Sequence, residues 1–405
     1  MTTLVAIAGL AFLILIHEAG HFATAMAVRM RPRKFYLGFP PPLVRTTRRG
    51  VEYGIGLIPL GGYVKIPGMF RPASGDVGRW FGRAEREAPS LHRPLRSLAE
   101  SLDESEFDRA QTELDAVEAA AADAELPDAA RREVERGVVE LRDGLSPDAY
   151  WRAASWRRIA VIFAGPGTNL LLAIVLFAAV FMVGSGVYRL GFSLEPAGTN
   201  ASRVVDSVLD GHPAQKAGLH AGDRVLAIDG KPVAPNQISQ VIGSSGGRPL
   251  ALTVRRDGRT VTLPPTSARR DDGESVPRAF AESFRVTGQV TKEIAFSLGR
   301  LVHGQGRDEI SSPVGIVRAS DQAIDQGPRQ YLSVLGLISL SLALLNLLPL
   351  LPLDGGHIAF SIVEAVRGRA VARAVYERFS AVGIAVVLLL FFVGLSNDLG
   401  GGVGG

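Results

Sequence analysis

Two histidines and a glutamate occupy a helix-period pattern near the start of the chain. His17, Glu18 and His21 form an H-E-x-x-H motif within LILIHEAGHFATA. In an α-helix, residues four apart differ by about 40° around the axis, so both imidazoles project from one face. Two such nitrogens can bind Zn²⁺, and Glu18 is placed to take a proton from a water molecule that the metal acidifies. The motif therefore predicts a metal site with Glu18 as a general base.

The surroundings of this motif strengthen that interpretation. The segment around it is apolar, and an ionisable group inside a membrane helix costs about 2.5–3.5 kcal/mol even on a lenient insertion scale. One alternative is a buried, hydrogen-bonded His–Glu cluster that joins helices. A metal site accounts for all three residues together, and we favour it.

A catalytic zinc typically has three protein ligands, and the sequence contains no cysteine, so the third must be His, Asp or Glu. Asp354 is the best candidate, because Pro349 and Pro352 interrupt the apolar run before it and irregular backbone at membrane depth is typical of a polar site. Asp354 could instead cap a helix beginning near His357. His357 is a rival ligand, but we expect it to lie near the metal without coordinating it.

The composition excludes several classes of protein. The 405 residues carry a net charge of +4, and 47% of them are hydrophobic. Such an even charge balance argues against nucleic acid as a partner, and the apolar content excludes an intrinsically disordered chain. The absence of cysteine excludes disulfides, cysteine-bound zinc and a thiol nucleophile.

Four apolar stretches are long enough to cross a bilayer as helices. They are residues 1–30, 159–183, 331–351 and 376–396. The first has no basic n-region and no small-residue cleavage site, so we interpret it as a retained helix and not as a signal peptide. Arginines and lysines gather in the loops after the first and third stretches, which predicts that these loops are cytoplasmic and that both termini lie outside.

The segments between these helices differ in character. Residues 31–70 are rich in Gly, Pro and β-formers, and short strands around 51–58 and 62–66 predict a membrane-associated β-hairpin or sheet; an ordinary loop is the alternative. Residues 71–150 predict a cytoplasmic insertion of two helices, separated by a break at Leu126–Pro127.

Residues 197–266 resemble a PDZ domain of the bacterial protease type, and we expect this domain to lie outside the cell membrane. Residues 279–303 predict an amphipathic helix on the outer membrane surface. The fold class is therefore a polytopic α-helical membrane protein.

HEAGH, LDGGH and a single PDZ-like segment together resemble the site-2 protease family, in particular its regulator-of-sigma-E-protease branch. The resemblance covers about residues 1–70 and 150–396. It implies a zinc-dependent intramembrane endopeptidase in which His17, His21 and Asp354 bind zinc and Glu18 is the catalytic base.

The resemblance also implies candidate substrate-binding residues. Asn169 ends the FAGPGTN element, and Asn346 and Pro349 precede Asp354. Gly54 and Gly56 belong to the β-structure that in this family is thought to bind substrate as an added strand. The chain departs from the family pattern in its 71–150 insertion, in having Ser312-Pro313 where Gly-Pro is frequent, and in its single PDZ domain.

The expected substrates are transmembrane segments of single-pass membrane proteins, such as anti-sigma factors already cut by a site-1 protease. The expected location is the bacterial inner membrane, with lipid as a partner. A different class of function is a non-proteolytic membrane PDZ scaffold with a structural metal. A metal transporter is disfavoured, because the sequence offers one cluster of ligands and no polar path across the membrane.

Overall fold

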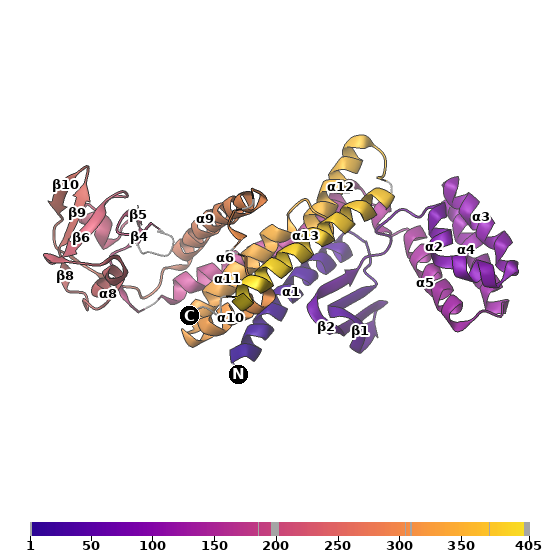
Figure 1. The fold of residues 1–405 in the computed structure, drawn as a ribbon, viewed down its shortest axis with the longest axis horizontal. Helices are drawn as coiled ribbons and strands as arrows, with labels where there is room; N and C mark the ends of the chain where they lie inside the picture. The colour runs from indigo at the N-terminus through magenta and orange to yellow at the C-terminus, as the bar shows by residue number, and fades with distance from the viewer. Residues whose placement is uncertain are drawn as a thin grey trace. The chain divides into compact units, whose positions relative to one another are not determined.

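The computed structural model describes residues 2–184, 186–195, 202–303, 305–307, 310–371 and 373–400. The chain divides into two compact units. The first comprises Met1–Ile174 with Thr287–Gly405, and the second comprises Val175–Val286. Figure 1 shows the elements of both units along the chain.

Four helices are long and apolar enough to cross a membrane among the described residues, which confirms the predicted number. They are α1 (Thr2–Ala27), α6 (Ser155–Val183), α11 (Pro328–Asn346) and α13 (Arg373–Gly400). With the sheets described below, they fit a multi-pass membrane protein that is mostly helical.

The third of these helices ends earlier than the apolar run suggested. α11 ends at Asn346 instead of 351, and an irregular segment leads to α12 (Asp354–Arg367). Pro349 and Pro352 lie in that segment, and a proline in a helix interior removes a hydrogen bond and clashes with the preceding turn. The interruption thus places Asp354 at the beginning of a new helix.

A further helix, α10 (Pro313–Asp325), was not predicted and contacts α1, α11 and α13. The Ser312 hydroxyl accepts a hydrogen bond from the Val314 N–H, and Pro313 occupies the first turn, where its missing N–H costs nothing. Ser312-Pro313, which stands where Gly-Pro is frequent in the family, therefore forms a regular helix N-terminus.

Small residues let α1 and α6 approach closely. A Cβ on Gly20 would lie 2.5 Å from the carbonyl oxygen of Ala164, nearer than any side chain allows. The Thr168 hydroxyl donates to the carbonyl of Ile16 across the same contact, at 3.2 Å. Gly20, within the histidine motif, thus brings the FAGPGTN element against α1.

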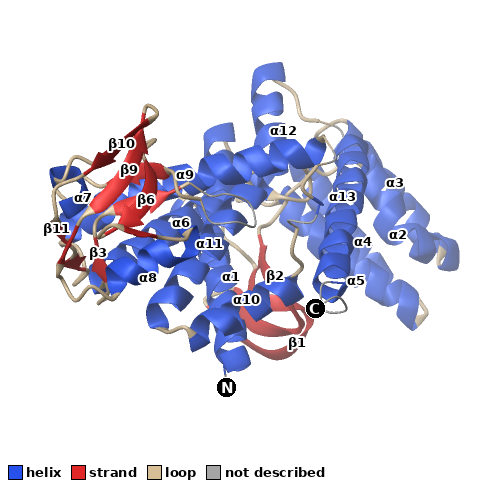
Figure 2. Cartoon of the chain, turned by 60° about the vertical axis from the view of Figure 1, so that its left-hand side comes forward, coloured by secondary structure: helices blue, strands red, loops and turns tan. Residues whose placement is uncertain are grey.

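β1 (Lys34–Arg48) and β2 (Val51–Lys65) form a bent sheet beside α1 (Figure 2). Phe35 is paired with Tyr53 and also with Val64, so the beginning of β1 lies between two parts of β2. Both predicted strands therefore belong to β2 and pair with β1, and they do not form a hairpin with each other. Alternation of apolar residues fixes which face a side chain occupies, but it does not specify which strand lies next to which.

The insertion contains four α-helices and not the expected two. They are α2 (Ser74–Glu87), α3 (His92–Asp103), α4 (Phe107–Asp123) and α5 (Asp128–Leu145), with short 3₁₀ segments η1 (Pro89–Leu91) and η2 (Tyr150–Arg152). Their apolar faces share one core, which includes Phe81, Leu98 and Leu114. The predicted break at Leu126–Pro127 separates α4 from α5. A second break at Ser105, whose φ is 60°, and a third before Pro89 were not anticipated.

Ion pairs join the insertion to the rest of the first unit. At the base of the sheet, the Arg33 Nε donates to Asp143 Oδ1 at 2.9 Å, and Lys65 Nζ lies 2.6 Å from Glu140 Oε1. A second set joins α2 to α13, namely Arg79 with Glu377 and Arg373 with Asp76. The insertion is thus held at both the β-sheet and the last membrane helix.

The second unit has its own β-rich core. Its largest sheet has the order β10-β9-β6-β7, and its core includes Leu219, Val225 and Val254. The strands are β3 (Tyr188–Arg189), β4 (Phe192–Leu194), β5 (Val205–Val208), β6 (Arg224–Ile228), β7 (Lys231–Pro232), β8 (Pro249–Leu250), β9 (Leu252–Arg256), β10 (Arg259–Thr262), β11 (Thr266–Ser267) and β12 (Arg269–Arg270). The short helices are α7 (Pro213–Lys216), η3 (Pro235–Gln237) and α8 (Ile238–Gly243).

The sequence of this unit predicts a short helix at Pro213–Ala217 and a strand at Asp223–Ile228, and α7 and β6 lie at these positions. The hairpin of β9 and β10 turns at Asp257–Gly258, where both residues have positive φ, as expected for that dipeptide. Residues 197–201 of the expected PDZ segment lie outside the described residues. The helix expected over 279–303 is α9 (Val276–Val302).

A buried carboxylate joins two segments of the β-rich core. Asp223 is only 1% exposed, and it accepts hydrogen bonds from Arg256 at 2.7 and 2.8 Å and from the backbone N–H of His220 at 2.9 Å. Burial alone would raise its pKa, but these donors hold the pKa of Asp223 below its usual value. The ionised carboxylate is therefore a stabilising feature of this unit.

We expect Asp223→Ala to lower the free energy of unfolding of the second unit by about 3 kcal/mol, because Arg256 and the His220 N–H lose their acceptor. Hydrogen exchange of the β6 amides in the full chain measures this change. Asp272→Ala, at a largely exposed carboxylate of the same unit, is the matched control.

The stabilisation from Asp223 should also depend on pH. It is fully present above the carboxyl's unfolded pKa of about 4, and it is lost as the pH falls through the lower folded-state pKa. Equal protection of β6 in wild type and in Asp223→Ala near neutral pH would contradict this account.

Candidate metal centre

Three ligand atoms from distant parts of the chain converge in the first unit. The Nε2 atoms of His17 and His21 are 3.2 Å apart. The Oδ2 atom of Asp354 lies 3.2 Å from the first and 3.3 Å from the second. Both histidines are buried, each 7% exposed. The structure thus brings together the two motifs that the sequence places at opposite ends of the chain.

The start of α12 directs the Asp354 carboxylate toward the histidines. Asp354 is the first residue of the helix, its N-cap is Leu353, and no side-chain hydrogen bond caps this end. A Cβ on Gly355 would lie 2.2 Å from the Leu347 carbonyl oxygen, so the turn packs against the irregular segment before it. The alternative in which Asp354 serves as a helix cap is therefore wrong.

A backbone carbonyl of α6 orients one imidazole. The Nδ1 of His21 lies 2.8 Å from the carbonyl oxygen of Val161, so Nδ1 carries the proton and donates it there. The lone pair of His21 is then on Nε2, which faces His17 and Asp354. Within the described part of the chain, the buried Nδ1 of His17 has no hydrogen-bond partner.

Gly165 of α6 lies directly against the two imidazoles. A Cβ at this position would be 2.2 Å from the Nε2 of His21 and 2.8 Å from the Nε2 of His17. Any side chain here would occupy the space between the ligand atoms. The glycine of the FAGPGTN element is therefore required to keep this space open.

Glu18 faces the β-sheet. A Cβ on Gly62 of β2 would lie 2.3 Å from the Cγ of Glu18 and 3.2 Å from its Oε1. The end of β2 therefore passes over the glutamate of the motif, at a residue without a side chain. This contact places a strand beside the candidate base.

The donor set fits zinc. Around a tetrahedral zinc with bonds near 2.1 Å, neighbouring ligand atoms are about 3.4 Å apart. The three separations of 3.2, 3.2 and 3.3 Å are close to that spacing. Among the described residues, this is the one group of three such side chains with metal-ligand spacing. His357, the rival ligand, is not part of the group.

The other residues singled out in the sequence lie in different settings. Asn169 is fully buried in α6, and its side-chain amide has no hydrogen-bond partner within the described residues. The backbone carbonyl of Asn169 accepts a hydrogen bond from the Ser339 hydroxyl of α11 at 2.8 Å. Asn346 donates to the Leu342 carbonyl of its own helix at 3.0 Å, and Pro349 is exposed in the segment that follows.

Gly54 and Gly56, the two glycines predicted to bind substrate, contact other residues of the sheet and do not lie at the metal centre. A Cβ on Gly54 would meet the ring of Tyr36 at 2.5 Å, and one on Gly56 would meet the Phe39 carbonyl oxygen at 2.2 Å. Both are thus needed for close packing between the sheet's own segments. Gly62 is the glycine of β2 that contacts the motif.

Sequence reasoning missed Gly62, Gly165 and the Val161 carbonyl. Gly165 lies in an element that was noticed, but the element was assigned to substrate through Asn169. Gly62 was noticed only as the beginning of a predicted strand and as part of a glycine pair before it. A signal was present for both glycines, because glycine within a helix or strand costs stability and so indicates a close approach. No sequence signal could have identified the Val161 carbonyl.

Comparison with known proteins supports the geometry. The model of peptidase family M50 matches residues 5–390. The chain is 29% identical to a protein of Agrobacterium fabrum named as a zinc metalloprotease, over 98% of this chain and 94% of the relative. It is 27% identical to the zinc metalloprotease RasP of Geobacillus kaustophilus (96% of this chain, 95% of the relative). It is 26% identical to the regulator of sigma-W protease RasP of Bacillus subtilis, with the same coverage.

The family match covers almost the whole chain, and it includes both segments that supply the three ligand atoms. The relatives are similar along nearly their entire length, so the likeness is not confined to one domain. The chain therefore belongs to peptidase family M50, the site-2 proteases, and is a multi-pass, zinc-dependent membrane metalloendopeptidase.

Proposed function

We propose that His17, His21 and Asp354 are the zinc ligands and that Glu18 is the catalytic base. The observation that carries this proposal is the convergence of the three ligand atoms at 3.2–3.3 Å. Zinc, when bound there, supplies Lewis acidity to water and to the scissile carbonyl.

The residues of the chain perform the remaining steps. Glu18 lies one residue after His17, about 100° around the helix, and so borders the metal centre without being one of its ligands. Its carboxylate takes a proton from the attacking water and returns it to the leaving amine. The Val161 carbonyl holds the imidazole of His21 throughout, through the hydrogen bond from Nδ1.

We propose that substrate lies along the end of β2, with its scissile bond near Glu18. A transmembrane helix hides its carbonyls in internal hydrogen bonds, and pairing as a strand exposes them while satisfying the backbone. The segment Gly62–Lys65 is paired with Lys34–Leu37 on one side. Gly62, rather than Gly54 or Gly56, is the position beside the base. Asn169, Asn346 and Pro349 are proposed to help hold the unwound substrate.

The proposed substrates are single-pass membrane proteins of the anti-sigma-factor type. One relative is named a regulator of sigma-W protease, which supports a role in releasing a sigma factor. In this scheme another protease first trims the substrate outside the membrane, and this enzyme makes the second cut in the transmembrane segment.

We propose that the second unit is a PDZ domain on the outer side of the bacterial inner membrane. Its short helix α7, the strand β6 and the hairpin of β9 and β10 support this assignment. The basic loops after α1 and between α12 and α13 support the proposal that the insertion is cytoplasmic and that both termini lie outside. The PDZ domain would then bind the new C-terminus of the trimmed substrate, or limit the size of what enters.

A membrane scaffold with a structural metal is the rival function. It predicts that the base is dispensable, whereas the ligands are needed for folding. The position of Glu18 against Gly62 favours the protease. A purely structural metal gives no reason for a carboxylate that lies between the metal centre and the end of a β-strand.

Glu18→Gln should lower cleavage of a single-pass reporter by about 10²- to 10⁴-fold, because the general base is lost. Zinc content should stay at the wild-type level, since Glu18 is not a ligand. The assay uses purified protein in proteoliposomes, with zinc measured by mass spectrometry on the same samples. Undiminished cleavage by the Gln variant would refute Glu18 as the base, whereas a wild type that binds zinc but does not cleave would support the scaffold.

Gly165→Ala should lower zinc affinity by about 10- to 100-fold, because its Cβ would enter the space between the imidazoles. Zinc retained after dialysis against a chelator measures the loss, with Asp354→Ala as the reference for a missing ligand. Gly167→Ala is the matched control, since its Cβ would meet only the Phe163 ring at 3.2 Å. Wild-type retention in Gly165→Ala would refute the proposed ligand set.

Gly62→Ala should lower cleavage by about 10²-fold at unchanged zinc content, because the added methyl displaces Glu18 and the strand above it. Thr46→Ala, at an exposed position of β1, should have little effect. If both variants cleave equally well, substrate does not lie at this end of β2.

A further inference from the structure

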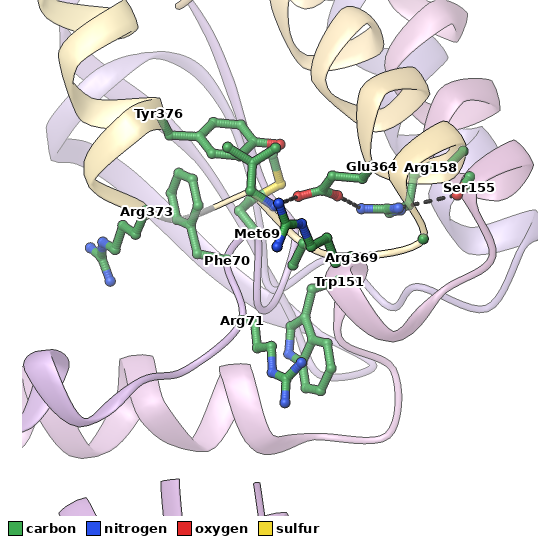
Figure 3. A pocket seen from close by; sticks show the side chains of 14 residues that line it. Met69, Phe70, Arg71, Trp151, Ser155, Arg158, Glu364, Arg369, Arg373 and Tyr376 are labelled. Carbon is green, nitrogen blue, oxygen red and sulfur yellow. Dashed lines mark hydrogen bonds and ion pairs between the residues drawn. The ribbon is translucent and has the colours of Figure 1, made fainter. Parts of the chain in front are cut away.

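A cavity of about 430 Å³ lies in the first unit, and none of the proposed zinc ligands lines it (Figure 3). Four arginines line it, contributed by four different segments, whereas its only carboxylate is Glu364. The arginines are Arg71, Arg158, Arg369 and Arg373. The proposed protease chemistry uses none of these residues.

Two of the four arginines are already neutralised. Arg158 lies 2.5 Å from Glu364 Oε2, and both side chains are about one-tenth exposed. The other oxygen of Glu364 accepts a hydrogen bond from the Val371 N–H at 2.8 Å, so both oxygens of this carboxylate have a partner within the protein. Arg373 pairs with Asp76 and Glu377.

Arg71 and Arg369 are left without a carboxylate among the described residues. Arg71 donates one hydrogen bond to the Ser105 hydroxyl and lies 5.6 Å from the centre of the Trp151 ring, which leaves several of its five N–H groups free. Arg369 is exposed in the loop between α12 and α13, and Figure 3 shows it between Glu364 and Trp151. The cavity therefore has an excess of positive charge that no carboxylate among the described residues balances.

The cavity lies where membrane helices begin. Arg158 is in the first turn of α6, and Arg373 is the first residue of α13, whose N-terminus adds a partial positive charge. Trp151 and Tyr376 also line it, and such amphipathic rings are enriched at the membrane surface. Met69, Phe70 and Val371 supply an apolar flank.

We propose that this cavity binds a phosphate group, supplied by the headgroup of an anionic phospholipid or by a soluble phosphate. Guanidinium groups match phosphate oxygens in fork geometry, and basic pockets between membrane helices hold anionic headgroups. Arg71 and Arg369 bind the phosphate, and the apolar flank receives the beginning of an acyl chain. Such a ligand would contact the insertion, α6 and α13 together.

The test compares wild type with the double variant Arg71→Gln/Arg369→Gln in full-length protein. Native mass spectrometry measures phosphatidylglycerol retained from nanodiscs of phosphatidylcholine with phosphatidylglycerol. In nanodiscs of phosphatidylcholine alone, a titration with inorganic phosphate measures the soluble source. We expect the double variant to bind about thirtyfold more weakly, or about fivefold for each arginine.

Arg367→Gln is the matched control, because Arg367 is exposed close by on α12 but does not line the cavity. Arg369→Gln alone covers the case in which loss of Arg71 disturbs folding, and it should bind about fivefold more weakly. Binding only of phosphatidylglycerol assigns the site to lipid, and saturable binding of inorganic phosphate assigns it to a soluble ligand. Equal binding by wild type and the Arg369 variant, or no binding of either probe, would overturn the proposal.

Discussion

Two imidazoles and a carboxylate at one point among apolar helices form the constraint on which this fold depends. Each ionisable group at membrane depth costs about 2.5–3.5 kcal/mol, and such groups are retained where they have a partner. Here the mutual separations of 3.2–3.3 Å match the spacing of zinc ligands. The architecture of the first unit follows from this point. α1 supplies the histidines, α6 orients one of them, and α11 must end at Asn346 so that α12 can begin with Asp354.

Glycines make the convergence sterically possible. Gly20 lets α1 meet α6, Gly165 leaves the space between the imidazoles open, and Gly62 lets β2 pass over Glu18. A methyl group at any of these positions would collide with the Ala164 backbone, with a histidine nitrogen or with Glu18. Of these segments, β2 is also joined to the insertion, through the ion pair of Lys65 with Glu140. A displacement of the insertion would therefore act on the strand that lies beside Glu18.

Much of this arrangement could be predicted from the sequence, because it depends on period and length. The spacing of His17 and His21 places them on one helix face, and four apolar runs of sufficient length predict four membrane helices. What could not be predicted depends on tertiary contact. The pairing of Phe35 with both Tyr53 and Val64 leaves no trace in the alternation of apolar residues. The break at Ser105 has no proline or glycine to announce it, and so the insertion was expected to have two helices instead of four.

The distance along the chain between His21 and Asp354 has a consequence for biosynthesis. The helices emerge in order, so α1, α6 and α11 are made before the segment that begins with Asp354 exists. Until then the two imidazoles lack the Asp354 carboxylate, and the three ligand atoms cannot converge. The group is therefore completed only when α12 has folded back against α1, after nearly the whole chain has been made.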